Sequence, residues 1–258
     1  PYGYVEGECN FQIDLDKISA SITPKTRILV LNDLQNPTAA ECSREELEAL
    51  AQIAIDNDLL VLSDEAYFDL RYSGKSTSIA SLPGMAERTV VLYTFSKKYA
   101  MTGWRVGGSI GPKKIVEVIA RLNTNDESNT THFLQWAAVE ALEGDQSGAQ
   151  HIVEVLKERR DCAVEILQSI DGLQCYKPEA SFYLYPNVTE VMKRKGFNDY
   201  EGFRKTVLKE TGVSFCNRLH FGRPLPGETD FYIRLAYSGI DKDAIEEGLG
   251  RLKDYLES

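Results

Sequence analysis

The sequence has little histidine, and its few cysteines are scattered. Its three histidines, His132, His151 and His220, are too far apart in sequence to suggest a zinc site. The cysteines show neither a CxxC spacing nor the Cys/His spacing of a metal site, so we predict no metal and interpret them as buried or inert thiols in a reducing compartment. They are Cys9, Cys42, Cys162, Cys175 and Cys216. Chemistry in this chain therefore has to come from Lys, Asp, Tyr, Asn and Arg side chains or from an organic cofactor.

The sequence also lacks an excess of basic residues and any long apolar run. The net charge is −10 and the pI is about 5.0, which argues against nucleic-acid binding because such proteins need a basic face to neutralise phosphates. No apolar run is long enough to cross a bilayer, so no membrane partner is expected. The first ten residues, PYGYVEGECN, have neither the basic nor the apolar segment of a signal peptide. We expect a globular protein with a cytoplasmic location.

Three short apolar runs predict the strands of a parallel sheet. They are residues 27–32 (RILVLN), 59–63 (LLVLS) and 89–94 (TVVLYT). Each run is apolar on successive residues rather than on alternate ones, which is typical of strands buried on both faces of a sheet.

A helix is predicted between the first two runs. Ser43 and Glu46 have the spacing of a capping box. After them comes an apolar stripe at helical spacing, made of Leu47, Leu50, Ala51 and Ala54. Strand, helix and strand with short joints form a βαβ unit, so we expect a right-handed crossover in a doubly wound α/β sheet.

The rest of the chain predicts more helices and a second domain. Residues 105–110 are a possible further strand, helices are expected at 113–122 and 132–143, and the long helix expected at 150–170 suits a link between domains. The C-terminal part alternates strands and helices, at 182–184, 200–210, 231–237 and from 241 to the end. We therefore predict a large α/β domain over residues 1–155 and a smaller α+β domain over residues 156–258.

Polar side chains follow each of the three predicted strands. Asn36 comes after the first strand, Asp64 and then Tyr67 after the second, and Ser96 and Lys97 after the third. Ligands of open α/β sheets bind beyond the carboxyl ends of the strands, so these side chains are expected to share one site.

This set of side chains suits the cofactor pyridoxal phosphate (PLP). Lys97 is predicted to form a Schiff base with the cofactor aldehyde. Asp64 is predicted to keep the pyridine nitrogen protonated, so that the ring takes up electrons. Asn36 and Tyr67 fit the phenolate oxygen of the ring. Phosphate is bound by hydroxyls and a guanidinium, and the residues available close to Lys97 are Thr94, Ser96 and Arg105.

The stretch TFSKKYAMTGWRVG (residues 94–107) resembles the lysine signature of the class I and II PLP-dependent aminotransferases, which have PLP fold type I. An arginine eight positions after the lysine belongs to that signature, and Arg105 stands there (105 − 97 = 8). Four further segments resemble family motifs in the family's order, with Ala39 and Ala180 where glycine is usual. They are QNPTA (35–39), SDEAY (63–67), PEASFYLYP (178–186) and FYIRLAYS (231–238).

The resemblance implies an amino-acid transaminase of the aspartate-aminotransferase type, with an amino acid and a 2-oxo acid as small-molecule substrates. Arg234 maps to the arginine that binds the substrate's α-carboxylate, with Asn36 beside it. Family members are usually homodimers, and residues 129–132 are expected near the phosphate of a neighbouring subunit. Loop residues Arg218, His220 and Arg223 are candidates for shaping the pocket.

Two alternatives remain open from the sequence: a β-lyase of the same fold, and a truncated, non-catalytic fragment. Chains of the family carry a sizeable part before the equivalent of Pro1, including the loop that cradles the phosphate. We therefore expect residues 1–258 alone to expose apolar faces of the sheet and not to hold PLP productively.

Overall fold

The computed structural model describes residues 4–6, 11–224 and 226–258, so Cys9 and Leu225 lie outside the described residues. The chain forms two compact units. Unit 1 contains residues 4–6, 11–35 and 40–153, and unit 2 contains residues 36–39 together with the chain from residue 154 onward. Each unit is described by itself.

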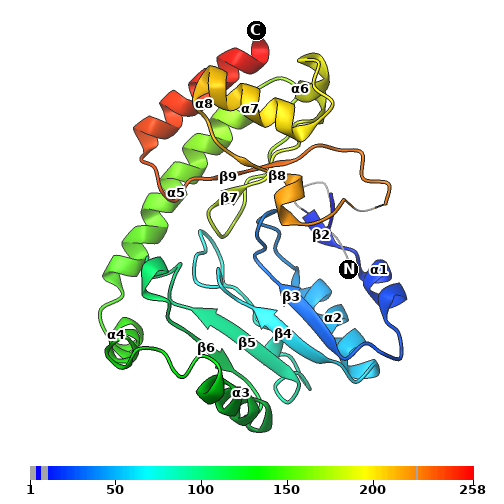
Figure 1. Cartoon of the computed structure of the whole chain (residues 1–258), viewed down its shortest axis with the longest axis vertical. Helices are drawn as coiled ribbons and strands as arrows, with labels where there is room; N and C mark the ends of the chain where they lie inside the picture. Colours follow the sequence, from blue (N-terminus) through cyan, green and yellow to red (C-terminus); the bar gives the residue numbers. More distant parts are fainter. Residues whose placement is uncertain (1–3, 7–10, 225) are drawn as a thin grey trace. The chain divides into compact units, whose positions relative to one another are not determined.

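Unit 1 is built on a four-stranded sheet with the strand order β3-β4-β5-β6 (Figure 1). The strands β3 (Ile28–Asn32), β4 (Leu60–Asp64) and β5 (Thr89–Thr94) are parallel, whereas β6 (Gly107–Ile110) is antiparallel to β5. The strands β3, β5 and β6 lie within predicted segments, and β4 extends one residue past its segment, to Asp64. In the register of the sheet Asp64 pairs with Asn32 on one side and with Leu92 on the other, so the carboxyl ends of β3, β4 and β5 form one edge.

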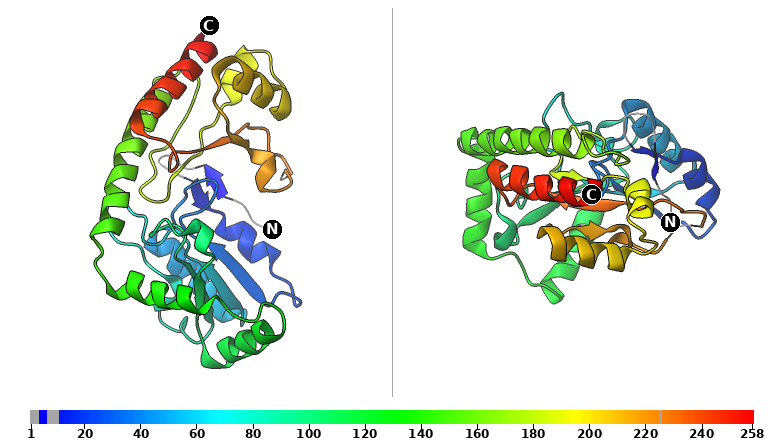
Figure 2. Two further views of the ribbon diagram at one scale, coloured as in Figure 1. Left: turned by 60° about the vertical axis from the view of Figure 1, so that its left-hand side comes forward. Right: turned by 90° about the horizontal axis from the view of Figure 1, so that it is seen from above.

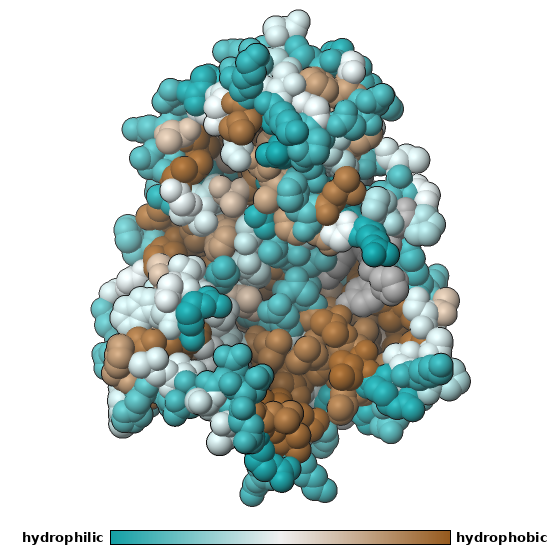
Figure 3. Space-filling model, in the orientation of Figure 1, coloured by the Kyte–Doolittle hydropathy of each residue, from teal (hydrophilic) through white to brown (hydrophobic). Residues whose placement is uncertain are grey.

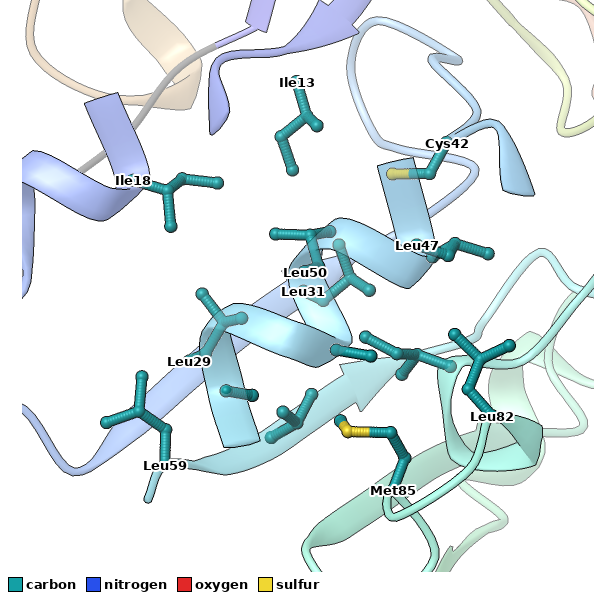
Figure 4. Packing of buried hydrophobic residues seen from close by; sticks show 14 residues of the cluster. Ile13, Ile18, Leu29, Leu31, Cys42, Leu47, Leu50, Leu59, Leu82 and Met85 are labelled. Carbon is teal, nitrogen blue, oxygen red and sulfur yellow. The ribbon is translucent and has the colours of Figure 1, made fainter. Parts of the chain in front are cut away.

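Helix α2 (Arg44–Asp56) covers one face of this sheet, as the βαβ pattern predicts. The predicted capping box is present: the Ser43 side chain accepts from Glu46 N, and the Glu46 side chain accepts from Ser43 N. Figure 4 shows Leu47 and Leu50 of the helix packed in one cluster with Leu29 and Leu31 of β3. Burial of these side chains gives unit 1 its main core.

The opposite face of the sheet is partly uncovered. Ile28 and Val30 of β3 are 54% and 52% exposed, and Leu60 of β4 is 39% exposed. Figure 3 shows a broad apolar area over this part of the molecule. The prediction that these strands are buried on both faces is therefore wrong for β3, because no described residue covers Ile28 and Val30, and the expected exposure of an apolar sheet face is confirmed.

Several elements of unit 1 had no signal in the sequence. They are the antiparallel pair β1 (Tyr4–Glu6) and β2 (Phe11–Ile13), the helix α1 (Leu15–Ser21), and the 3-10 turns η1 (Ile79–Ser81) and η2 (Thr102–Trp104). The predicted helices after the sheet are present as α3 (Lys113–Asn125) and α4 (His132–Glu143).

Unit 2 contains a three-stranded antiparallel sheet with the order β7-β9-β8. Its strands are β7 (Tyr183–Leu184), β8 (Cys216–Asn217) and β9 (Ile233–Ala236). Its helices are α5 (Ser147–Gln168), which starts in unit 1, α6 (Thr189–Arg194), the turn η3 (Arg218–Phe221), α7 (Tyr200–Thr211) and α8 (Lys242–Glu257). Figure 2 shows α8 running beside α5, where Cys162 Sγ lies 3.7 Å from Glu246 Oε1.

Helix α5 also carries a buried arginine with two partly exposed carboxylates beside it, within unit 2. Arg160 is 2% exposed; its guanidinium pairs with Asp161 at 2.8 Å and donates to the carbonyl of Pro178 at 2.8 Å. Glu179 lies 3.6 Å away. These contacts tie α5 to the segment that leads into β7.

Cys42, Cys162 and Cys175 are buried free thiols, as predicted, and Cys216 is half-buried. Burial raises the pKa of the Cys175 thiol to about 12, so this sulfur stays protonated at neutral pH. Within the part of the chain that the structure describes, no helix combines the length and the apolar character needed to cross a membrane.

Candidate active site

The carboxyl-end edge of the sheet in unit 1 carries Asp64 as the last residue of β4. The carboxylate is half-buried, and its Oδ1 accepts from the backbone N–H of Ala66 at 3.2 Å. Glu65 follows with its N–H on the carbonyl of Leu92, so the parallel pairing with β5 continues past Asp64. The strand pairing therefore holds the Asp64 carboxylate at the edge where ligands of this fold class bind.

Lys97 and Tyr67 meet at this edge. The Tyr67 side chain is 5% exposed, and Lys97 Nζ lies 5.9 Å from the centroid of its ring. The neighbouring Lys98 has a different surrounding: its Nζ lies 3.6 Å from Asp69 Oδ2 and over the ring of Tyr99 at 5.0 Å. The Lys98 ammonium is thus held by a carboxylate, whereas Lys97 lies beside the Tyr67 ring.

Two hydroxyls precede Lys97. Thr94 Oγ1 donates to Ser96 Oγ at 3.0 Å and accepts from the Ser96 N–H at 3.2 Å, and Ser96 is 7% exposed. Arg105, predicted to bind phosphate with them, is exposed and has left-handed backbone geometry with φ 55°. Its guanidinium donates to the carbonyl of Thr102 at 2.9 Å.

The structure shows why position 107 of the same motif needs a glycine, which the sequence alone did not show. A Cβ at this position would lie 2.7 Å from the carbonyl oxygen of Tyr93. Gly107 pairs with Thr94 in the sheet, so the absence of a side chain lets β6 approach β5 beside the two hydroxyls.

Arg234, on β9 of unit 2, lies among polar and aromatic side chains. Its guanidinium donates to Asn36 Oδ1 at 2.8 Å and to Cys216 Sγ at 3.6 Å. The rings of Tyr183 and Phe221 lie 4.4 Å and 4.8 Å from its Cζ. Its Nε is buried without a hydrogen-bond partner among the residues that the structure describes. A guanidinium stacked on aromatic rings with a buried, unsatisfied donor is suited to bind an anion.

The Asn36 segment is closed by two hydrogen bonds at its ends. The N–H of Cys42 donates to Asp33 Oδ1 at 2.8 Å, and the N–H of Gln35 donates to the carbonyl of Ala40 at 2.9 Å. Burial raises the pKa of the Asp33 carboxyl to about 6, against the lowering effect of the backbone N–H groups that it accepts from. Between these ends the Asn36–Pro37 peptide is cis, and Ala39 has φ 56°, where family members usually have glycine.

The site residues predicted from the sequence fall into the two units. Lys97, Asp64, Tyr67, Thr94, Ser96 and Arg105 lie in unit 1, and Asn36 and Arg234 lie in unit 2. The structure brings Lys97 beside Tyr67, Thr94 beside Ser96, and Asn36 beside Arg234. The side-chain hydrogen bonds of Asp64 and Arg105 go instead to the backbone of Ala66 and Thr102.

Sequence reasoning missed the aromatic partners of Arg234 because Tyr183 and Phe221 are distant from it in sequence and belong to no chemical motif. Two of the three loop candidates, His220 and Arg218, bind partners within the loop and at its start. His220 Nδ1 accepts from the N–H of Asn217 at 3.1 Å, and Arg218 pairs with Glu228 at 2.9 Å. Arg223 is exposed.

Comparison with known proteins identifies the family. The profile of the aminotransferase class I and II family matches residues 3–252. The chain is 35% identical to an aspartate aminotransferase of Bacillus subtilis, over 98% of this chain and 64% of that protein. It is 34% identical to an asparagine–oxo-acid transaminase of Streptococcus mutans, over 97% of this chain and 62% of that protein.

A solved structure of an aromatic aminotransferase from Pyrococcus horikoshii superposes with a TM-score of 0.84 at 30% identity, covering 96% of this chain and 64% of that one. The chain thus spans less than two thirds of the length of the relatives it matches. The similarity confirms the predicted α/β fold class, fold type I of the PLP enzymes.

Enzymes of this family generally depend on PLP and act on amino acids and oxo acids. The predicted motifs lie inside the matched range, in the order that the sequence analysis found. On the match over residues 3–252 and the shared fold, the chain belongs to the class I and II aminotransferase family.

Proposed function

We propose that this protein is an amino-acid transaminase that moves the amino group of an amino acid to a 2-oxo acid, with PLP held at Lys97. The observation that carries the proposal is the position of Lys97 Nζ, 5.9 Å from the ring centroid of Tyr67, at the sheet edge where β4 ends in Asp64. Membership of the aminotransferase family supports it.

The donor set fits the cofactor. Lys97 would hold PLP through its amine, and Asp64 would face the ring nitrogen. Tyr67 and Asn36 would donate to the phenolate oxygen. The phosphate would be held by the hydroxyl pair that the structure joins at 3.0 Å and by a guanidinium, which are Thr94, Ser96 and Arg105.

Asn36 can serve two partners because a carboxamide has both an acceptor and a donor. Its Oδ1 accepts from Arg234 at 2.8 Å. Its Nδ2 is the group assigned to the cofactor oxygen, so one side chain would link the substrate-binding arginine to the cofactor.

When bound, PLP supplies an aldehyde that takes the amino group and a ring that takes up electrons from Cα. Lys97 Nζ would be the base that takes the proton from Cα and the acid that returns it. The Asp64 carboxylate keeps a proton at the ring nitrogen. Arg234 would bind the α-carboxylate through its in-plane N–H groups and so orient the amino acid.

The test compares two adjacent lysines. Lys97→Ala in the holoenzyme is expected to lose the visible absorption band that borohydride abolishes and to lower kcat by about 10²–10⁴-fold. Lys98→Ala is the matched control and is expected to keep both the band and the turnover. A band retained in Lys97→Ala and lost in Lys98→Ala would place the cofactor on the other lysine.

A panel of amino donors with 2-oxoglutarate and pyruvate distinguishes the transaminase from the β-lyase. A transaminase turns over only with an acceptor, whereas release of pyruvate and ammonia without one would contradict the proposal. The relatives named above are aspartate, asparagine and aromatic aminotransferases, so these donors are the first to assay.

The proposal also covers the domains, the location and the oligomeric state of the protein. We assign residues 1–155 to the cofactor domain and residues 156–258 to the smaller domain, in a cytoplasmic homodimer. Exposed apolar side chains of α4 support a subunit interface: Phe133 is 70% exposed and Trp136 is 66% exposed. Sedimentation of the wild type and of Trp136→Glu tests this, since only the wild type is expected to sediment as a dimer.

A further inference from the structure

The loop between β8 and β9 of unit 2, described over residues 218–224 and 226–232, places an aromatic ring against Arg234. Cys216 is paired with Arg234 in the sheet register, and Phe221 lies 4.8 Å from its Cζ. Because Phe221 is the last residue of η3, the conformation of this loop decides where its ring lies.

The Arg218 side chain links separate parts of the loop through hydrogen bonds and an ion pair. Its Nε and NH2 lie 2.9 Å and 3.1 Å from the two carboxylate oxygens of Glu228, which is a bidentate pair. The same guanidinium donates to the carbonyls of Gly222 and Arg223, at 3.2 Å and 3.3 Å. The side chains of Arg218 and Glu228 are only 16% and 19% exposed, so water screens this pair less than a surface pair.

The start of η3 is held by separate hydrogen bonds. The N–H of Arg218 donates to the carbonyl of Tyr232 at 3.0 Å, and the N–H of Leu219 donates to Asn217 Oδ1 at 3.0 Å. The turn is thus attached to Tyr232, directly before β9, on one side of Phe221, and to the Arg218 guanidinium through Gly222 on the other.

We propose that the Arg218–Glu228 ion pair positions the Phe221 ring over Arg234 and thereby sets the affinity of the site for the carboxylate of the substrate. The inference rests on the proposed function through the role of Arg234. The N–H groups of a guanidinium lie in its plane, so a ring against its face leaves the edge to a carboxylate and keeps water from the face. Arg218 and Glu228 are positioning residues.

An alternative role for Arg218, as a second carboxylate-binding arginine, does not agree with this geometry. Its donors are directed at Glu228 and at two backbone carbonyls, so a substrate carboxylate would have to displace an internal one.

The first measurement follows the conformation of the loop by protease cleavage, not by enzyme activity. In the wild-type holoenzyme the Arg218 guanidinium is paired, whereas Glu228→Gln keeps the shape of the side chain and removes its charge. Trypsin cleavage after Arg218, read by mass spectrometry, is expected to accelerate several-fold in Glu228→Gln. Glu247→Gln breaks an Arg–Glu pair within α8 and is the matched control, for which cleavage after Arg218 stays at the wild-type rate.

The second measurement is calorimetric titration of the holoenzymes with propionate, a carboxylate without an amino group. Glu228→Gln is expected to weaken propionate binding about fivefold, the size of one lost cation–π contact. Phe221→Leu removes the ring and keeps the ion pair, so it should weaken binding equally without faster cleavage after Arg218. The double variant should be no weaker than either single one, because both act through one contact.

Faster cleavage with wild-type propionate affinity in Glu228→Gln, or wild-type affinity in Phe221→Leu, would overturn the inference. Additive losses in the double variant would also overturn it. A wild-type protein without transaminase activity, in which these variants still weaken propionate binding, would refute the proposed function and leave the inference standing.

Discussion

The Asp33 carboxyl is expected to make the protein less stable as pH rises toward neutrality. Burial raises its pKa from 3.8 to about 6 in the folded state, so between these values the folded state binds a proton that the unfolded state has lost. Where the folded state binds more protons, the free energy of unfolding falls with rising pH. The loss begins near pH 4 and is complete above about pH 6.

The full shift of about 2 pH units corresponds to about 3 kcal/mol, at 1.36 kcal/mol per unit. Asp33 is only half-buried, so screening reduces this to about 1–3 kcal/mol. Asp33→Asn removes the ionisation and keeps an oxygen that accepts from the Cys42 N–H, which donates to Asp33 Oδ1 at 2.8 Å. The variant should therefore match the wild type at about pH 3.5, below the unfolded pKa, and exceed its stability by about 1–3 kcal/mol at about pH 7.5.

Urea unfolding followed by far-ultraviolet circular dichroism, at several pH values between these limits, measures the difference. Asp126→Asn, on an exposed side chain at the end of α3, accounts for the change of net charge. The buried Glu65, whose pKa burial also raises, is present in every variant and so cancels. A stability difference between Asp33→Asn and the wild type that does not grow with pH would refute the reasoning.

Three further predictions concern stability and catalysis. Arg160→Ala leaves the buried carbonyl of Pro178 without its donor and should lower the free energy of unfolding by about 2–4 kcal/mol in urea titrations. Ala39→Gly relieves the left-handed backbone at φ 56° and should raise the thermal midpoint, with a net gain of about 0.5–1 kcal/mol; a lower midpoint would contradict this. Asp64→Asn should retain the cofactor band but lower kcat/KM by about 10²-fold or more in a transaminase assay, since an amide cannot keep the ring nitrogen protonated.

Most of the sheet of unit 1 could be predicted because its signals are local. The apolar runs of β3, β4 and β5 are continuous, and the capping box of Ser43 marks the start of α2 to the residue. In unit 2 the strands expected at 182–184 and 231–237 are present as β7 and β9, whereas β8 was not predicted, since its two residues show no periodicity. The prediction that β3 is buried on both faces was wrong for Ile28 and Val30, because an apolar run does not show which face of a strand a neighbouring element covers.

The candidate site likewise has a part that the sequence predicts and a part that only the structure shows. Asp64 and Lys97 follow predicted parallel strands, so the rule that ligands bind at carboxyl ends was enough to group them. The contact between Asn36 and Arg234 joins residues 198 positions apart, and no spacing rule reaches that far. The family resemblance supplied the role of Arg234 but not its rings, which become visible only when β7, β9 and η3 are assembled.

The surroundings of Arg234 explain why this cation, rather than the neighbouring Arg218, is suited to bind an anion. Arg218 is paired with Glu228 inside the protein. The partners of Arg234 within the described residues are instead neutral: the Asn36 amide, the Cys216 sulfur and two rings. Its buried Nε lacks an acceptor among the same residues. An unsatisfied buried donor costs about 1–3 kcal/mol of folding free energy, and a bound carboxylate recovers that cost, so the site is less stable without its ligand and more selective for an anion with it.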